Sequence, residues 1–241
     1  VAPDLMYADG YGYRSGLNEL MRKNLEGIVA QAETIVDLKD DDIVVDIGCN
    51  DGTLLDAYKS KKLDRVGFDL VASIVSTARD KGIDAINECF TKESFSSARP
   101  NRKAKVVTSI AMFYDLERPN LFVKSIKKNL DKEGVWCIQL SYVLLMTKNL
   151  NFYDICHEHL EYYSLKSLEY LMNKHGLEII HAETNNVNGG SALVFIKHKT
   201  KQNKKTKEYK RIISIERKMN LSSTTVYKNF YKNMNILSSK V

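Results

Sequence analysis

The stretch V-V-D-I-G-C-N-D-G-T-L-L, residues 44 to 55, decides the fold. It overlaps a β-branched apolar run, Ile43 to Ile47, which predicts a short buried strand of a parallel sheet. Gly48 and Gly52 then allow a tight loop, and Thr53 to Ser60 has the pattern of a helix. A strand, a glycine loop and a helix in this order predict a nucleotide-type ligand at the carboxyl end of the strand.

Strand-like and helical segments alternate along the chain beyond this loop. Strands are expected at Arg65 to Phe68, Val106 to Ile110 and Val135 to Leu140, and helices at Ser73 to Lys81, Pro119 to Leu130 and Ser164 to His175. Strands separated by helices predict right-handed βαβ units in a mostly parallel sheet with helices on both faces. Two further runs, Glu178 to Glu183 and Ala192 to Lys197, flank a turn-rich segment and predict a closing antiparallel hairpin.

The charges around the glycine loop narrow the ligand. Asp69 ends the second strand, 21 residues beyond Gly48, where a carboxylate can accept hydrogen bonds from both hydroxyls of a ribose. Asp46 and Asp51 flank the loop, whereas the pyrophosphate of NAD requires unopposed N–H groups, and the G-x-x-x-G spacing also disfavours NAD. S-adenosylmethionine (SAM) is cationic, lacks phosphate and has a free ribose, so it fits all these features. The alternative is that Asp46 and Asp51 only cap the turn and the helix.

The composition excludes several classes of protein. The 241 residues, of which 44% are hydrophobic, can bury a real core, so general disorder is excluded. Four Cys without a C-x-x-C pair predict neither a disulfide framework nor a zinc knuckle, and they favour a cytoplasmic location. We expect no membrane span and no signal peptide, because no apolar stretch approaches the roughly 20 residues of a span. Val1 in place of Met suggests a segment of a longer protein.

The net charge of +6 is unevenly distributed. From Lys197 onward, 13 Lys or Arg residues accompany only two acidic residues, Glu208 and Glu216, so the remainder of the chain is acidic. Such a run is usually a solvated linker or helix face, and an anion-binding tail is the alternative. No aromatic residues interleave its first half to stack on bases, so we expect no specific nucleic-acid binding.

The segment I-C-H-E-H-L-E-Y-Y-S, residues 155 to 164, holds two of the five histidines. In an extended segment, His157 and His159 would point one way, and Cys156 and Glu158 the other. An imidazole can take a proton at neutral pH and an adjacent carboxylate can orient it, which favours acid–base chemistry. Two alternatives remain open: zinc binding, although the H-E-x-x-H spacing is absent, and a structural, hydrogen-bonded histidine.

Residues 44 to 55 resemble motif I of the class I SAM-dependent methyltransferases, and the closing hairpin is similar to the end of their seven-stranded Rossmann-like sheet. Together with Y-G-Y-R-S, H-E-H-L-E-Y-Y-S and G-G-S-A-L-V-F-I-K-H, the motif resembles the deoxysugar C-methyltransferases, which methylate nucleotide-linked keto-sugars. The similarity extends from about Asp4 to about Leu237. It implies an α/β methyltransferase that uses SAM as cofactor and takes a small-molecule substrate, a nucleotide-linked sugar.

The resemblance also implies the site residues. For the cofactor they are Asp46, Gly48, Asn50, Asp51 and Gly52 at the methionine portion, Asp69 at the ribose, Cys89 and Phe90 near the adenine, Leu70, and Ser109, Ile110 and Met112 after the fourth strand. For the substrate, Phe113 and Cys156 stand at positions of the family's sugar site, and Tyr11, Tyr13 and Tyr142 are candidates by residue type, with packed or exposed tyrosines as the alternative. In the family's mechanism His159 removes a proton from the carbon beside a ketone, Glu158 assists, and the enolate attacks the sulfonium methyl without a metal.

Several positions depart from the pattern of that family. Cys156 stands where a Tyr is common, and Ser109 and Phe113 stand where Asn and His face the sugar. Gln139 occupies the place of a usual Glu. These departures leave SAM binding in place, but they leave open both the sugar and the choice between methylation of carbon and of oxygen.

Three parts are expected along the chain. Residues 1–38 form a Tyr-rich loop and a helix packed on the core, 39–200 form the SAM-binding methyltransferase domain, and 201–241 form a basic helical segment. The family has a zinc-binding domain before this region and a C-terminal domain after it, so we expect the last segment to begin a missing domain. A catalytically altered SAM-binding module and an O-methyltransferase acting on another small molecule remain as alternative functions.

Overall fold

The computed structural model describes residues 12–239. Its seven strands are β1 (Ile43–Ile47), β2 (Asp64–Phe68), β3 (Asp84–Ile86), β4 (Ala104–Ile110), β5 (Leu130–Ser141), β6 (Leu177–Asn185) and β7 (Ser191–His198). They form one sheet in the order β3-β2-β1-β4-β5-β7-β6, in which β7 pairs antiparallel with both of its neighbours and the other pairs are parallel. This arrangement confirms the α/β fold class, the seven strands and the closing hairpin.

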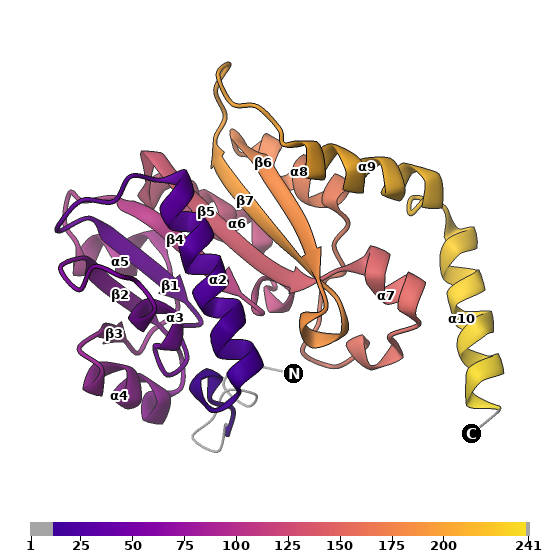
Figure 1. The fold of residues 1–241 in the computed structure, drawn as a ribbon, viewed down its shortest axis with the longest axis horizontal. Helices are drawn as coiled ribbons and strands as arrows, with labels where there is room; N and C mark the ends of the chain where they lie inside the picture. Colours follow the sequence, from indigo (N-terminus) through magenta and orange to yellow (C-terminus); the bar gives the residue numbers. More distant parts are fainter. Residues whose placement is uncertain (1–11, 240–241) are drawn as a thin grey trace.

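Helices cover both faces of the sheet (Figure 1). The α-helices are α2 (Glu19–Ile35), α3 (Thr53–Asp56), α4 (Ala72–Asp80), α5 (Lys92–Ala98), α6 (Pro119–Asn129), α7 (Val143–Asn149), α8 (Leu165–Lys174), α9 (Lys207–Met219) and α10 (Thr224–Ser238). The short 3-10 turns are η1 (Ser15–Leu17), η2 (Phe113–Asp115), η3 (Phe152–Asp154) and η4 (Val187–Gly189). Side chains of α2, α3 and α4 share one apolar core, and those of α5, α6, α8 and α9 share the core on the other face.

The regular elements form where the local pattern predicts them. All five residues of β1 are buried, as expected for the central strand of a doubly covered sheet. Helix α2 begins after Asn18, whose side chain accepts hydrogen bonds from the backbone N–H groups of Leu20 and Met21. Helix α8 begins with a capping box between Ser164 and Ser167. These caps satisfy backbone donors that would otherwise lack partners.

Some boundaries differ from the expected ones. The helix expected over 53–60 ends at Asp56, and Tyr58 is buried in the core that α2 and α3 share. The basic helical segment expected over 201–241 contains two helices, because Asn220 adopts a left-handed conformation, with φ of 52°, and ends α9. Helix α9 buries Tyr209, Ile212 and Glu216, whereas α10 lies at the outer edge of the molecule (Figure 1). Within residues 12–239, no helix is long and apolar enough to cross a membrane.

Candidate active site

A cavity of about 690 Å³ opens at the carboxyl ends of β1, β2 and β4. The segments that line it include Asp46 to Asn50, Phe68 to Val71, Glu88 to Thr91, Ile110 to Met112, and Glu158 with His159. This edge is where ligands bind in open α/β sheets, because the loops between strand and helix diverge there. The cavity therefore brings the glycine loop and the histidine segment, about 110 residues apart in sequence, to the same space.

The backbone of the glycine loop includes left-handed residues and is held in place by hydrogen bonds. Gly48 and Gly52 have φ of 72° and 75°, and Asn50 also lies in the left-handed region. The N–H of Gly48 donates to the carbonyl of Phe68 at 2.8 Å, which ties the loop to the next strand. The Asp69 carboxylate accepts from the N–H of Asn50 at 2.9 Å and from the N–H of Val71 at 3.0 Å. Asp69 is thus held at the cavity wall by one hydrogen bond to each oxygen.

Asp46 is a buried carboxyl group at the start of this loop. Its side chain is only 3% exposed, and its Oδ1 accepts a hydrogen bond from the Thr108 hydroxyl at 2.6 Å. Burial, with the nearby charge of Asp69, raises the pKa of Asp46 to about 8. Within the described residues, no Lys or Arg forms an ion pair with Asp46 or Asp69. A cationic ligand would supply the missing positive charge, so the site fits SAM better than a pyrophosphate.

The N-terminal segment lies across the glycine loop. The N–H of Ser15 donates to Asn50 Oδ1 at 2.9 Å, and the N–H of Gly16 donates to Asp51 Oδ2 at 3.0 Å. Asp51 also accepts from the Thr53 hydroxyl at 2.7 Å, so its carboxylate is used within the protein. These contacts bring Tyr13 to the cavity wall, whereas Asp51 and Gly52 support the loop from behind the wall. Tyr11 lies outside the described residues.

Most of the less polar residues that were expected to contact the cofactor line the cavity. Leu70, Cys89, Phe90, Ile110 and Met112 all line it. Ser109 does not, because it is fully buried and its hydroxyl accepts a hydrogen bond from the indole N–H of Trp136 at 3.1 Å. The expected position of Ser109 is corrected accordingly.

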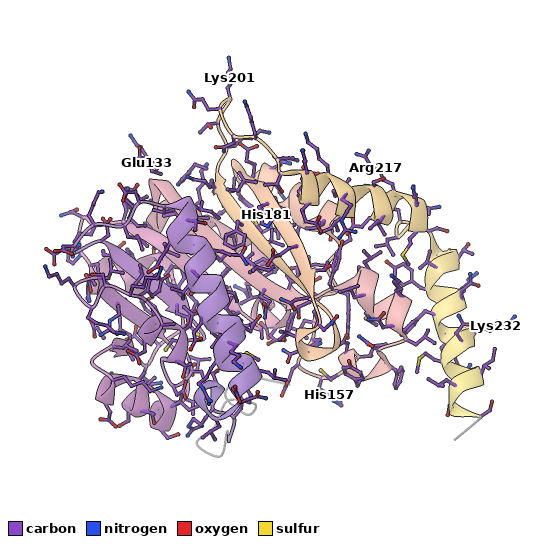
Figure 2. The ribbon with its side chains drawn as sticks, viewed as in Figure 1. Glu133, His157, His181, Lys201, Arg217 and Lys232 are labelled. Atoms are coloured by element: carbon purple, nitrogen blue, oxygen red, sulfur yellow. The ribbon has the colours of Figure 1, made fainter. Side chains whose placement is uncertain are left out.

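The histidine segment bends, which changes the expected alternation. Residues 156–158 form a bend, so both Glu158 and His159 reach the cavity. Cys156 and His157 do not line it, and Figure 2 shows His157 at the outer edge of the molecule. The prediction that Glu158 and His159 would face opposite ways was therefore wrong. In the part of the chain that the structure describes, no three His, Cys, Asp or Glu side chains are grouped to hold a metal ion.

Besides Cys156, two expected substrate residues lie away from the cavity. Phe113 is fully buried among aromatic rings, with Trp136 at 5.6 Å and Tyr163 at 5.3 Å between centroids. Tyr142 is also fully buried, and its hydroxyl donates to Glu216 of α9. Their packing partners come from distant parts of the sequence, which a local motif does not reveal. Both expected contacts with the substrate are corrected.

Tyr114 and Asn188 are among the cavity residues that the sequence did not reveal. Tyr114 lines the cavity, and its ring centroid lies 4.1 Å from that of the His159 imidazole. Asn188, in the turn between β6 and β7, lines the same cavity. The N-N-V-N-G-G turn was visible in the sequence, but nothing local indicated that it folds over the carboxyl ends of the central strands.

Comparisons with known proteins agree with this geometry. The family described as "Methyltransferase domain" matches residues 13–182. The C-methyltransferase NovU of Streptomyces niveus is 25% identical over 231 residues, which are 95% of this chain. The match covers 55% of NovU, so the chain spans about half the length of this relative.

Solved structures share the fold at low sequence identity. A Haloferax volcanii methyltransferase in complex with the Trm112 activator gives a TM-score of 0.58 at 16% identity, covering 77% of this chain and 95% of that one. Magnesium protoporphyrin IX methyltransferase from Synechocystis PCC 6803 with bound SAM gives 0.55 at 12% identity, covering 81% and 89%. With the family match over most of the chain and a cavity suited to a cationic nucleoside, the chain belongs to the class I SAM-dependent methyltransferases.

Proposed function

We propose that this methyltransferase transfers a methyl group to a carbon atom beside the ketone of a nucleotide-linked deoxysugar. The observation that carries the proposal is one cavity in which the acidic glycine loop and a His–Glu pair face the same space. The name of the relative, a C-methyltransferase, supports transfer to carbon. Transfer to carbon requires a residue that removes a proton, because a carbon beside a ketone is not a nucleophile until it loses one.

We assign the cofactor site residue by residue. Asp69 would accept hydrogen bonds from the ribose hydroxyls. Each of its oxygens accepts one hydrogen bond from a backbone N–H and keeps a further lone pair for this purpose. Asp46, Gly48 and Asn50 would surround the methionine portion, and the apolar side chains of Leu70, Cys89 and Phe90 would face the adenine. Ile110 and Met112 would form the adjoining wall, while Asp51 and Gly52 would keep the loop in shape.

His159 would act as the general base. It is half-buried on the cavity wall, and the adjacent Glu158 lies on the same wall. Asp154 interacts electrostatically with His159, and its own carboxyl is withdrawn from solvent. Carboxylates near an imidazole favour the imidazolium that forms when the ring accepts a proton. We therefore assign proton removal to His159, with Glu158 as its partner and Tyr13 as a substrate contact.

The bonds in this reaction balance simply. His159 takes the proton as the C–H bond of the substrate breaks, and the electron pair is delocalised onto the ketone oxygen. SAM supplies an electrophilic methyl group, so a C–C bond forms as the S–C bond breaks. No oxidant or reductant is required.

Transfer to oxygen is the second candidate. The side chain at position 156, where the resemblance places an assisting phenol, is a Cys that lies outside the cavity. A base beside the cavity could equally deprotonate a hydroxyl group. The two candidates differ in the atom that carries the new methyl group.

The test is methyl transfer from SAM labelled with ¹³C in the methyl group. With dTDP-4-keto-6-deoxyglucose as the probe substrate, we expect a product heavier by one methylene unit and a ¹³C signal in the range of a methyl on carbon. A signal in the range of an O-methyl group would favour the second candidate. Binding of SAM without transfer to this or related keto-sugars would favour the catalytically altered module.

A further inference from the structure

Tyr114 is an aromatic neighbour of His159, and it contacts the histidine segment in two ways. Its ring centroid lies 4.1 Å from that of the imidazole, with the ring planes inclined by 51°. Its backbone carbonyl accepts hydrogen bonds from the N–H groups of Leu160 and Glu161, both at 3.0 Å. The same residue therefore holds the chain immediately after His159 and covers one side of the imidazole ring.

The turn that carries Tyr114 is rigidly anchored. It lies in η2, directly beyond the carboxyl end of β4. Its neighbour Phe113 is fully buried and packs on Phe122, Trp136 and Tyr163. By contrast, residues 155–163 form no helix or strand. A fixed turn thus supports an irregular segment, which is the arrangement that a precisely placed functional group requires.

We propose that Tyr114 is a positioning residue for His159, whose aromatic face orients the imidazole in the cavity and stabilises the imidazolium formed on proton uptake. The face of a tyrosine ring attracts a cation that lies within about 6 Å of the ring centroid. Neutral imidazole gains less from this attraction than imidazolium does, so the ring favours proton uptake by His159. The inference rests on the proposed function, because it gives a role to the base assigned there.

Other charged groups lie beside His159 or line the same cavity. Glu158 adjoins it in the segment, Asp154 approaches from η3, and Asp115, Glu117 and Arg118 line the cavity from the loop after β4. Replacing Tyr114 leaves all of these groups in the chain. A change in the titration of His159 that occurs on replacement by Leu but not by Phe therefore reports the loss of the ring rather than of the hydroxyl group.

The test is an NMR titration of the five histidines in wild type, Tyr114→Leu and Tyr114→Phe, without any substrate. The His159 signal is assigned by its absence in His159→Asn. Leu keeps apolar cover over the imidazole but has no π face, so we expect the His159 titration midpoint to fall. The ring-current shift of the His159 protons should disappear as well. Phe keeps the face, so both features should stay as in wild type.

Controls separate this role from a general effect on folding. Tyr170 on α8 is 73% exposed, and Tyr170→Leu should leave the His159 titration unchanged. If Tyr114→Leu does not fold, Tyr114→Met serves as a longer side chain without a ring. An unchanged His159 midpoint in a folded Leu or Met variant would overturn the proposal.

A kinetic arm connects the ring to turnover. Methyl transfer to the keto-sugar probe should fall about tenfold to a hundredfold in Tyr114→Leu, since small misplacements of a catalytic group have effects of this size. Wild-type turnover in folded Tyr114→Leu would overturn the orienting role. The proposed function fails separately, if His159→Asn retains turnover, because the titration itself needs no substrate.

Discussion

The glycine loop and the histidine segment line the same cavity but are built differently. The loop is an extension of a fully buried strand, and Cys49, Asn50 and Asp51 within it are 2%, 9% and 5% exposed. The histidine segment has no regular structure, and Ile155 and Leu160 are 48% and 47% exposed. Its backbone is fixed mainly by a distant partner, the Tyr114 carbonyl.

This structural difference indicates that cofactor binding and the chemical step depend on different parts of the cavity. The loop is held by hydrogen bonds from the sheet itself, such as that from Gly48 to the Phe68 carbonyl, so its shape follows from the fold. The histidine segment depends on a few contacts between loops, which are the contacts that differ most readily between enzymes of one fold. Changes in the segment should therefore alter turnover, and changes in the loop should alter cofactor affinity or stability.

The largest expected effect is on turnover. His159→Asn should lower methyl transfer by about 10²- to 10⁴-fold, the usual contribution of a general base, while SAM affinity stays as in wild type. Turnover is measured with labelled SAM, and affinity by calorimetry. His157→Asn is the matched control, because His157 lies outside the cavity and should keep activity. Equal losses in both variants would contradict the separation of the two regions.

A smaller effect is expected on cofactor affinity. Asp69→Ala should weaken SAM binding roughly tenfold to a hundredfold, because a hydrogen bond to a charged acceptor contributes about 1.5–3 kcal/mol. Thermal shifts with SAM, S-adenosylhomocysteine and NAD measure this, and NAD should give no shift with wild type. Asp80, exposed on α4, provides the control Asp80→Ala, which should bind normally. An unchanged SAM shift in Asp69→Ala would reject the assignment of the ribose contact.

A substitution in the glycine loop should also lower the stability of the protein. Gly52 has φ of 75°, and a Cβ there would lie 2.4 Å from Ile83 Cδ1 and 3.1 Å from Ala78 Cβ. Gly52→Ala should therefore lower the free energy of unfolding by about 1–3 kcal/mol and the melting temperature by several degrees. Gly27 in α2 has open space around its Cα, so Gly27→Ala should be neutral or slightly stabilising. Equal melting temperatures for the two variants would refute the steric argument.

The smallest expected effect is a pH-dependent gain in stability. Burial raises the pKa of Asp46 to about 8, whereas an unfolded Asp ionises near 3.9. The folded state thus binds a proton that the unfolded state has lost, and this costs stability as the pH rises from about 4 to about 8. Asp46→Asn removes the cost, so relative to wild type the variant should be more stable at pH 8 than at pH 5.

Urea unfolding at both pH values, without SAM, measures this gain. Asp56→Asn is the control of opposite sign, because the Lys61 ammonium lowers the pKa of the exposed Asp56. That variant should gain nothing. A gain for Asp46→Asn that is larger at pH 5 than at pH 8 would contradict burial of the carboxylate as its cause. Asp46→Asn should also bind SAM more weakly.

Local patterns in the sequence predicted the parts of the molecule that depend on local physics. The strand before Gly48, the caps of α8 and the hairpin from β6 to β7 all follow from residue type and spacing. Asp69 could be placed because strand, loop and helix have nearly fixed lengths in this kind of unit. Most of the residues expected to bind the cofactor therefore line the cavity.

Residues whose place depends on tertiary packing were predicted poorly. Phe113 and Tyr142 looked like substrate residues, yet aromatic packing and a hydrogen bond to Glu216 bury them. Tyr114 is the next residue after Phe113 and reaches the cavity, because a single 3-10 turn sends the two side chains in different directions. Likewise, the bend at residues 156–158 replaces the alternating side-chain directions that were expected for an extended segment. Such one-residue differences depend on contacts that no sequence spacing contains.

Proton removal by His159 is the central claim, and hydrogen–deuterium exchange tests it most directly. The keto-sugar probe dTDP-4-keto-6-deoxyglucose is incubated with the enzyme in D₂O without SAM, and loss of the proton beside the ketone is followed by NMR. We expect wild type to catalyse the exchange and His159→Asn to be at least about 100-fold slower. Exchange by His159→Asn at the wild-type rate, or none by wild type while methyl transfer proceeds, would contradict the account.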